Sequence, residues 1–356
     1  MIALLKYGTG VPFHRLGQLQ DSLGIPLPAS TQWEIAEGVA NKVYLAFEEL
    51  IRQGAQGEIV HNDDTTARIL ALMKQPAQPQ EAENPQDSPA ETDAKSRTGL
   101  FTTAIVSRFD GHSMALFFTG REHAGENLAK VLARRDPERS PPIQMCDALS
   151  RNDPKGVKTF LAHCLAHGRR KFVDVAENFP QECRYLLETL RQVYHHEAIC
   201  KEQNLSPPER LQFHQEHSGP LMEELHQWLK AQFDQKLVEP NSGLGQAISY
   251  MLKHWEPLTL FLRKAGAPLD NNLCERALKK VILHRKNAYF FQTEHGAYIG
   301  DLFLSLIHTC QLGGANPFDY LTQLQKHSAQ LRQNPGAWMP WNYRQTLNAQ
   351  GQPGEN

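Results

Sequence analysis

Residues 100–119, LFTTAIVSRFDGHSMALFFT, decide the fold class of this chain. Both halves of the stretch are rich in β-branched and aromatic side chains, which favour extended backbone. Asp110 and Gly111 stand between the halves, and an Asp-Gly pair between two such runs is a signal for a tight hairpin turn. The stretch therefore predicts two antiparallel strands, over 100–109 and 113–119.

More β-structure is expected on either side of this hairpin. The short apolar run Glu58-Ile59-Val60 leads into polar residues 61–66, and another run over 143–146 ends at Asp147. The intervening segment GENLAKVLARR has helical spacing of its apolar residues. Three or so early strands beside helices predict a mixed α/β core.

Residues 1–57 are expected to be helical. One helix is predicted over about 14–23, followed by a Gly-Ile-Pro-Leu-Pro turn and a long second helix. Ser30 and Thr31 are candidate N-caps of the long helix, and Glu34 completes a capping box with Thr31. A helix-turn-helix is possible, but a plain pair of packed helices is the simpler interpretation.

The pattern after Pro154 is helical almost to the end of the chain. Residues 155–178 are expected to form one amphipathic helix, and three more helices are indicated before residue 256. Asn271 and Asn272 are candidate N-caps of a helix that carries Glu275.

A further apolar helix is expected over about 296–313. The tail from Asn334 is rich in Pro, Gly and Gln and is expected to fray. Residues 75–97 are interpreted as a disordered linker, because residues 75–95 hold four prolines and lack large apolar side chains.

Composition indicates an ordinary globular protein. Hydrophobic residues make up 40% of the chain and charged residues 21%. The formal net charge is −2, so overall charge provides no argument for nucleic-acid binding. No apolar run is long enough to cross a membrane, and we expect a cytoplasmic, nucleoid-associated protein. The six cysteines are scattered, which argues against a disulfide framework.

Three acidic residues could form a metal site. Asp63 and Asp147 follow strand-like runs, and Glu275 lies in the first turns of a predicted helix. The intervals along the chain are 147 − 63 = 84 and 275 − 147 = 128. Carboxylates are the ligands Mg²⁺ prefers, and two ions can serve phosphoryl transfer. The plainer alternative is that Asp63 caps a turn and Glu275 pairs with Lys279 on the helix surface.

Local basic clusters offer a second hint of chemistry. One contains Arg169 and Arg170, and the other contains Lys279, Lys280, Arg285 and Lys286. Such clusters contact phosphate backbones in DNA-binding proteins, although most are solvated helix faces.

Two nearby features remain open. Residues 289–291, Tyr-Phe-Phe, could stack on bases or could belong to the core. Cys164 and His167 have C-x-x-H spacing, but two ligands do not complete a zinc site, so a buried Cys and a helix-face His are expected. The signatures of P-loop, dinucleotide, serine-hydrolase and zincin enzymes are absent from the sequence.

The chain resembles the insertion-sequence 66 family of transposases through several ordered stretches. They include HNDDTTARIL, PIQMCDALSRN, CLAHGRRKF and PLDNNLCERALKKVILHRKNAYFF. The resemblance implies an RNase H-like catalytic core with a DDE triad. It places Asp63, Asp147 and Glu275 as catalytic, metal-binding residues, with Asp64 where the family usually has glutamate.

The resemblance also implies an organisation. We expect an N-terminal helical segment over 1–57, the first part of the core over 58–153, a helical insertion over 154–265, the end of the core over 266–313, and a C-terminal element over 314–356.

The implied activity is DNA cleavage and strand transfer with two magnesium ions, for which manganese could substitute. Expected partners are double-stranded DNA, a second copy of the chain and accessory proteins of the element, but no membrane. Arg169, Arg170 and Arg276, together with Lys279, Lys280, Arg285 and Lys286, are expected to contact DNA. Because the family's usual cysteine-rich zinc-binding region is absent from this sequence, the alternative is a truncated, non-catalytic remnant that only binds DNA or an intact transposase.

Overall fold

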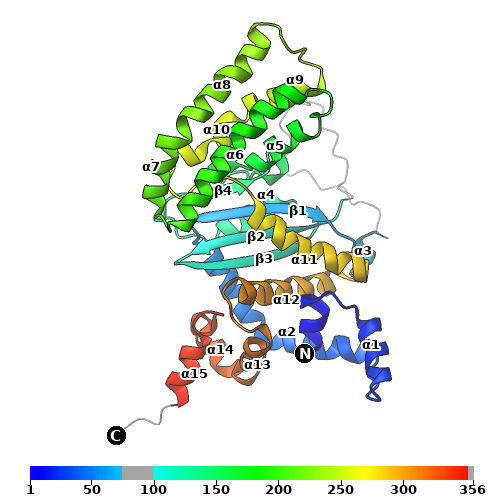
Figure 1. Ribbon diagram of the computed structural model, residues 1–356. Helices are drawn as coiled ribbons and strands as arrows, with labels where there is room; N and C mark the ends of the chain where they lie inside the picture. Colours follow the sequence, from blue (N-terminus) through cyan, green and yellow to red (C-terminus); the bar gives the residue numbers. More distant parts are fainter. Residues whose placement is uncertain (74–98, 352–356) are drawn as a thin grey trace, which may run out of the picture. The chain divides into compact units, whose positions relative to one another are not determined.

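The computed structural model describes residues 1–73 and 99–351, and the predicted linker over 75–97 lies outside this part of the chain. The chain divides into two compact units (Figure 1). Unit 1 comprises Met1–Gly57, Asp63–Asp136 and Cys274–Asn356, and unit 2 comprises Glu58–Asn62 and Pro137–Leu273. Strand β1 (Ile59–Thr66) and helix α11 (Asn272–Ala288) each begin in unit 2 and continue in unit 1.

The secondary structure makes this an α/β protein with a mixed sheet of five strands. Their order is β3-β2-β1-β4-β5. In unit 1, β2 (Phe101–Phe109) and β3 (His112–Gly120) are antiparallel. In unit 2, β4 (Ile143–Cys146) runs parallel both to the start of β1 and to β5 (Phe160–His163).

The predicted hairpin is confirmed. Phe109 pairs with His112, and the two turn residues Asp110 and Gly111 have φ angles of 49° and 76°. Positive φ at both positions is the type I′ geometry that matches the twist of the flanking strands.

Helices surround the sheet portion of unit 1. The predicted pair near the N-terminus is confirmed as α1 and α2, although α2 begins at Ala29 directly after Pro28, so Ser30 and Thr31 are not its N-caps. Proline presets φ for the start of a helix, which brings the boundary forward. The helical elements are η1 (Leu4–Gly8), α1 (Phe13–Ser22), α2 (Ala29–Gly54), α3 (Leu70–Met73), α4 (Ala124–Leu132), α12 (Glu294–Leu312), α13 (Pro317–Lys326), α14 (Ser328–Gln333), η4 (Pro335–Trp338) and α15 (Tyr343–Gly351).

The C-terminal segment is ordered as far as residue 351, contrary to the expected fraying from Asn334. Trp338 and Tyr343 are each only 1% exposed. The Tyr320 hydroxyl donates a hydrogen bond to the Trp338 carbonyl, and the Tyr343 hydroxyl donates one to Asp319. Burial of these aromatic rings outweighs the unfavourable Pro- and Gly-rich composition.

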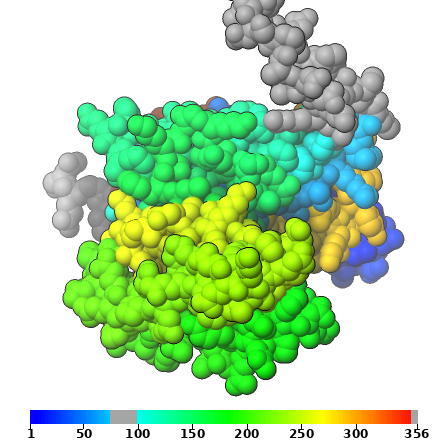
Figure 2. Space-filling view, turned by 90° about the horizontal axis from the view of Figure 1, so that it is seen from above, coloured from blue at the N-terminus to red at the C-terminus, as the bar shows by residue number. Residues whose placement is uncertain are grey.

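Unit 2 consists of β4, β5 and a helical block around one apolar core. The helical elements are η2 (Ser150–Asn152), α5 (Leu165–Val173), α6 (Pro180–Glu202), α7 (Pro207–His217), α8 (Gly219–Asp234), α9 (Gly243–Lys253), α10 (Trp255–Leu258) and η3 (Leu260–Leu262). The helices of this block are among the green to yellow atoms in the space-filling view (Figure 2).

The single helix predicted over 155–178 is wrong. β5 and α5 occupy this stretch, with Cys164 between them. The strand Phe160–His163 is too short to show an alternating pattern, and its pairing with β4 overrides the helical spacing.

Two further predictions concern cysteines and membranes. All six cysteines lie in the described residues, where they are buried and free of disulfide bonds, as the sequence predicted. Across residues 1–73 and 99–351, no helix combines the length and apolar character needed to cross a bilayer.

Candidate active site

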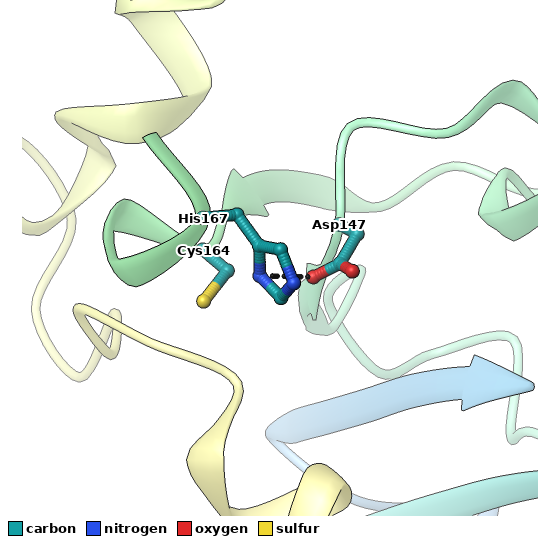
Figure 3. Close-up of side chains that lie close together, drawn as sticks. All are labelled: Asp147, Cys164 and His167. Carbon is teal, nitrogen blue, oxygen red and sulfur yellow. Dashed lines mark ion pairs between the residues drawn. The ribbon is translucent and has the colours of Figure 1, made fainter. Parts of the chain in front are cut away.

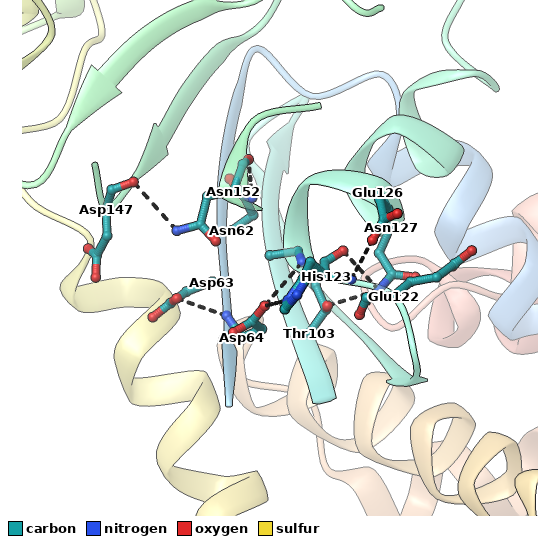
Figure 4. Close-up of polar contacts among 11 residues, drawn as sticks. Asn62, Asp63, Asp64, Thr103, Glu122, His123, Glu126, Asn127, Asp147 and Asn152 are labelled. Atoms are coloured by element: carbon teal, nitrogen blue, oxygen red, sulfur yellow. Dashed lines mark hydrogen bonds and ion pairs between the residues drawn. The ribbon is translucent and has the colours of Figure 1, made fainter. Parts of the chain in front are cut away.

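β1 continues beyond the apolar run that predicted it, so Asp63 and Asp64 lie within the strand instead of after it, on opposite faces (Figure 4). Asp64 points towards His123, whereas Asp63 points to the other side, towards the body of α11. Side chains alternate along a strand, so this division follows directly from the backbone. Asp63 is half-buried, and its Oδ1 accepts a hydrogen bond from the Asp64 amide at 2.8 Å.

Asp64 is bound to the start of helix α4. Its carboxylate is fully buried, with Oδ2 3.0 Å from His123 Nδ1 and 3.4 Å from the Ala124 amide nitrogen. Ala124 is the first residue of α4, where a negative charge is favoured by the helix dipole. Asp64 therefore anchors the start of α4, whereas the half-buried Asp63 carboxylate lies on the other face of the strand.

Helix α11 is bonded to the last residues of β1. The Arg285 guanidinium donates hydrogen bonds to Thr65 Oγ1 at 3.3 Å and to Thr66 Oγ1 and the Thr66 carbonyl. The thiol of Cys274 donates to the Ala104 carbonyl on β2 at 3.3 Å. Glu275, half-buried, stands in the first turn of this helix, so unit 1 contains two of the three predicted acids.

The third acid, Asp147, belongs to unit 2 and directly follows β4. The loop after β4 is bound to β1 through a buried amide network. Asn62 Nδ2 donates to the Asn152 carbonyl at 2.9 Å, and Gln144 Nε2 donates to Asn62 Oδ1 at 2.9 Å. Asn152 Nδ2 in turn donates to the Asp147 carbonyl at 3.5 Å. These contacts hold the backbone of Asp147 relative to the first half of β1.

Asp147 forms a cluster with the C-x-x-H pair (Figure 3). His167 Nδ1 lies 2.9 Å from Asp147 Oδ1, and the donor atoms of Asp147, Cys164 and His167 all lie within 4.8 Å of one another. The hydrogen bond to Asp147, followed by the contact with Cys164, raises the pKa of His167 to about 10. At neutral pH the imidazolium therefore neutralises the Asp147 carboxylate.

The cluster shows what the sequence prediction missed. Cys164 is buried and His167 lies on α5, as expected, but the third member, Asp147, was assigned elsewhere. The parallel pairing of β4 with β5 brings the residues that follow both strands to one edge of the sheet. Because β5 is only four residues long, its sequence carried no signal for this pairing.

Asn271 connects β1 to the start of α11 within unit 2. Its Oδ1 lies 3.1 Å from His61 Nδ1, and its Nδ2 donates to the Asn62 carbonyl at 3.3 Å. Its amide also donates to Cys164 Sγ at 3.3 Å. Asn271 is fully buried, so it acts through these bonds rather than as an exposed cap.

The predicted DNA-contacting residues lie on two surfaces. On α11, Arg276, Lys279, Lys280 and Lys286 are exposed, whereas Arg285 is half-buried and bonded to β1. On α5, Arg169 and Arg170 are exposed.

Arg169 also lines a groove. The groove has a volume of about 890 Å³ and contains Arg184 and Arg191 of α6. Arg184 is paired with Glu188, which also lines the groove, whereas a guanidinium group such as that of Arg169 suits phosphate oxygens.

Comparison with known proteins identifies relatives. The family model described as "Transposase IS66 family" matches residues 1–299. The uncharacterized protein y4hP of Sinorhizobium fredii is 29% identical over 90% of this chain and 56% of the relative. The uncharacterized protein y4jD of the same organism is 28% identical over 96% of this chain and 65% of the relative. The chain thus spans less than two thirds of the length of these curated relatives.

Proposed function

The chain belongs to the IS66 family of transposases, and we propose that it contains the catalytic domain of a DDE-type DNA transposase with an RNase H-like core. In this proposal Asp63, Asp147 and Glu275 are the catalytic acids. The protein cuts the ends of a mobile DNA element and joins them to target DNA. It works on double-stranded DNA at the bacterial nucleoid, as a homo-oligomer and with accessory proteins of the element.

The observation that carries the proposal is the register of β1 on β4. Ile59 pairs with Ile143, Val60 with Gln144 and His61 with Met145, so the offset in residue number is 84 at each pair (143 − 59 = 84). The two aspartates have the same offset, 147 − 63 = 84. The shared offset supports the choice of these two aspartates as the first two acids of the proposed triad.

The position of α11 supports the choice of the third acid. Within unit 1, α11 is bonded to the end of β1 through Arg285, and Asp63 points towards this helix. Glu275 in its first turn is the acid that such a helix could bring to the same site.

The donor set fits magnesium. Three carboxylates offer the oxygen ligands that this ion prefers, and Asp63 and Asp147 are each half-buried, as accessible ligands should be. When bound there, Mg²⁺ or Mn²⁺ supplies Lewis-acid activation of the attacking and leaving oxygens. The sulfur and nitrogen donors beside Asp147 suit softer ions, so we assign His167 instead as the group that orients and neutralises this carboxylate.

The remaining residues position the substrate. The exposed cations of α11, Arg276, Lys279, Lys280 and Lys286, are proposed to contact the phosphate backbone beside Glu275. Arg169 and Arg170 are proposed to do the same on unit 2. Arg285 holds α11 on β1, and Asn271 holds the start of that helix.

The test is a strand-transfer assay with Glu275→Gln in the presence of Mg²⁺. We expect a loss greater than the roughly 10–100-fold that removal of an outer-shell partner costs, because the variant loses a ligand charge. Glu294→Gln is the matched control, since Glu294 is exposed in the first turn of another helix of unit 1.

Retention of activity by Glu275→Gln would exclude the triad. Binding of DNA without cleavage by the unaltered chain would instead favour the non-catalytic alternative.

A further inference from the structure

A cavity in unit 1 has none of the three predicted acids in its lining. It has a volume of about 820 Å³. Sites for small molecules commonly have volumes of several hundred cubic ångströms, so the cavity is large enough for such a ligand. Its walls come from η1, α1, α2, the segment after α11 and the start of α12. The aromatic members of this lining are Tyr7, Phe13, Trp33, Phe290 and Phe291.

A buried ammonium group is the second feature of the cavity. Lys6 lines it and is only 9% exposed, with Nζ 4.9 Å from the ring centre of Phe13 and 5.9 Å from that of Tyr7. Within residues 1–73 and 99–351, no hydrogen bond or ion pair reaches this ammonium group. An ammonium group that lines a confined cavity without an acidic partner attracts an anion, and its hydrogen bonds to an anion are strong.

The surroundings favour negative charge on the ligand. Thr293, the N-cap of α12, and Gly296 in its first turn line the cavity, so the positive end of this long helix lies there. The one carboxylate in the lining, Glu37, lies 2.6 Å from His295 Nε2. The Glu37 carboxylate thus has His295 as its partner.

The aromatic side chains of the cavity favour a nucleotide over a simple anion, because a base can stack on an accessible ring. Tyr7 lies in a stack of rings, with Phe303 at 5.3 Å on one side and His284 at 5.9 Å on the other, and Phe291 continues the stack beyond His284. Phe290, in contrast, is 46% exposed, so its ring is accessible to a ligand. Exposed aromatic rings beside cations are the usual means of holding unpaired bases.

We propose that this cavity receives one nucleotide of a DNA strand, with its phosphate beside the Lys6 ammonium and its base against Phe290 and Trp33. The inference rests on the proposed function, which makes DNA the substrate. It adds that the protein holds a base outside the duplex stack. Residues 289–291 thereby acquire two roles: Phe291 packs inward, and Phe290 faces the ligand.

The first experiment uses isolated ligands, so that it does not depend on transposase activity. Binding of thymidine 5′-monophosphate, inorganic phosphate and thymidine to the full chain is measured by calorimetry. We expect the nucleotide to bind at least tenfold more tightly than either part. Lys6→Met and Phe290→Ala should each weaken nucleotide binding at least tenfold, whereas Lys42→Met, at an exposed position of α2, should leave it unchanged.

Thermal unfolding shows whether these variants fold. Lys6→Met should melt at the same or a higher temperature than the native chain, because it replaces a largely buried lysine without an acidic partner by an apolar side chain. Loss of binding without loss of stability supports the site. Equal binding of phosphate and nucleotide, absence of nucleotide binding, or native affinity in folded Lys6→Met would overturn it.

A second experiment separates this proposal from the proposed function. A blunt duplex is compared with the same duplex carrying one unpaired terminal nucleotide. We expect the unpaired end to bind about tenfold more tightly, and Lys6→Met to remove this preference without changing affinity for the blunt duplex. Equal affinity for both duplexes refutes the pocket while leaving the transposase assignment intact. Selective nucleotide binding in a chain that cannot transfer strands supports the pocket and refutes the assignment.

Discussion

At the scale of single residues, Asp63 and Asp64 are adjacent on β1 but have different roles: Asp63 is proposed to be catalytic, and Asp64 stabilises the fold. They are neighbours of the same type, but Asp64 is fully buried against His123 and the start of α4, whereas Asp63 is half-buried on the opposite face of β1. Nothing in the pair itself distinguishes them. The distinction comes from which face of the strand packs on α4.

Replacement of Asp64 tests this division. Asp64→Ala leaves His123 Nδ1 and the Ala124 amide without their carboxylate, so we expect the free energy of unfolding to fall by about 1–3 kcal/mol. Asp63→Ala should change it by less than about 1 kcal/mol, as at a partly exposed site. Urea unfolding of both variants provides the comparison, and a larger loss for Asp63→Ala would reverse the roles given to the two residues.

At the scale of elements, helix α12 covers the outer edge of the sheet with a ladder of side chains. Asp301, Ser305 and Thr309 accept hydrogen bonds from the amides of Thr119, Phe117 and Ala115 on β3. Steps of four residues along a helix span about 6 Å, and steps of two along a strand span nearly the same distance. The ladder satisfies donors of an edge strand that would otherwise be open to other chains.

Removal of the hydroxyl groups should weaken this edge. Ser305→Ala and Thr309→Val each leave a buried amide without an acceptor, and we expect each to cost about 1–3 kcal/mol of unfolding free energy. Both hydroxyls are buried, with Ser305 0% and Thr309 1% exposed. Chemical unfolding measures the loss, and light scattering should show more aggregation in the double variant. Unchanged stability in both single variants would mean that the ladder contributes nothing.

Asp301, the third member of the ladder, should make the free energy of unfolding depend on pH. Burial raises the pKa of Asp301 to about 7 from an ordinary value of 3.8. The folded state then holds a proton that the unfolded state has released, so this contribution to stability falls as pH rises from 3.8 to about 7. Asp301→Asn cannot titrate, and it should flatten this part of the curve of melting temperature against pH. An identical slope in the variant would assign the dependence to other groups.

At the scale of the whole molecule, DNA binding cannot come from overall charge. Acidic residues outnumber lysine and arginine by 39 to 37, so affinity depends on where the cations are placed. Several cations lie together on the exposed face of α11 in unit 1 and along the arginine-lined groove in unit 2.

Salt dependence measures the contribution of the α11 surface. Each phosphate contact adds about 0.9 to the slope of log affinity against log salt. Lys279→Gln with Lys280→Gln should therefore weaken duplex binding and reduce the magnitude of this slope by roughly 1.8. Lys42→Gln with Lys130→Gln is a control of equal charge. If the two double variants behave alike, the α11 surface makes no specific contribution.

Local sequence patterns determine many of the helices and strands of this chain. The hairpin at Asp110-Gly111, the helix pair near the N-terminus, β4 and the helix carrying Glu275 all follow from propensity, spacing and turn chemistry, which act over a few residues. The family followed from long ordered motifs. These features were predictable because neighbouring residues alone decide them.

Tertiary structure decided the rest. β5 is a strand because β4 pairs with it, and the tail after Asn334 is ordered because Trp338 and Tyr343 are buried. Asp147 meets Cys164 and His167, and Lys6 lines one cavity with Trp33 and Phe290, only after distant segments pack. Burial and strand pairing join residues that are far apart along the chain, and no local pattern encodes the free energy of such contacts.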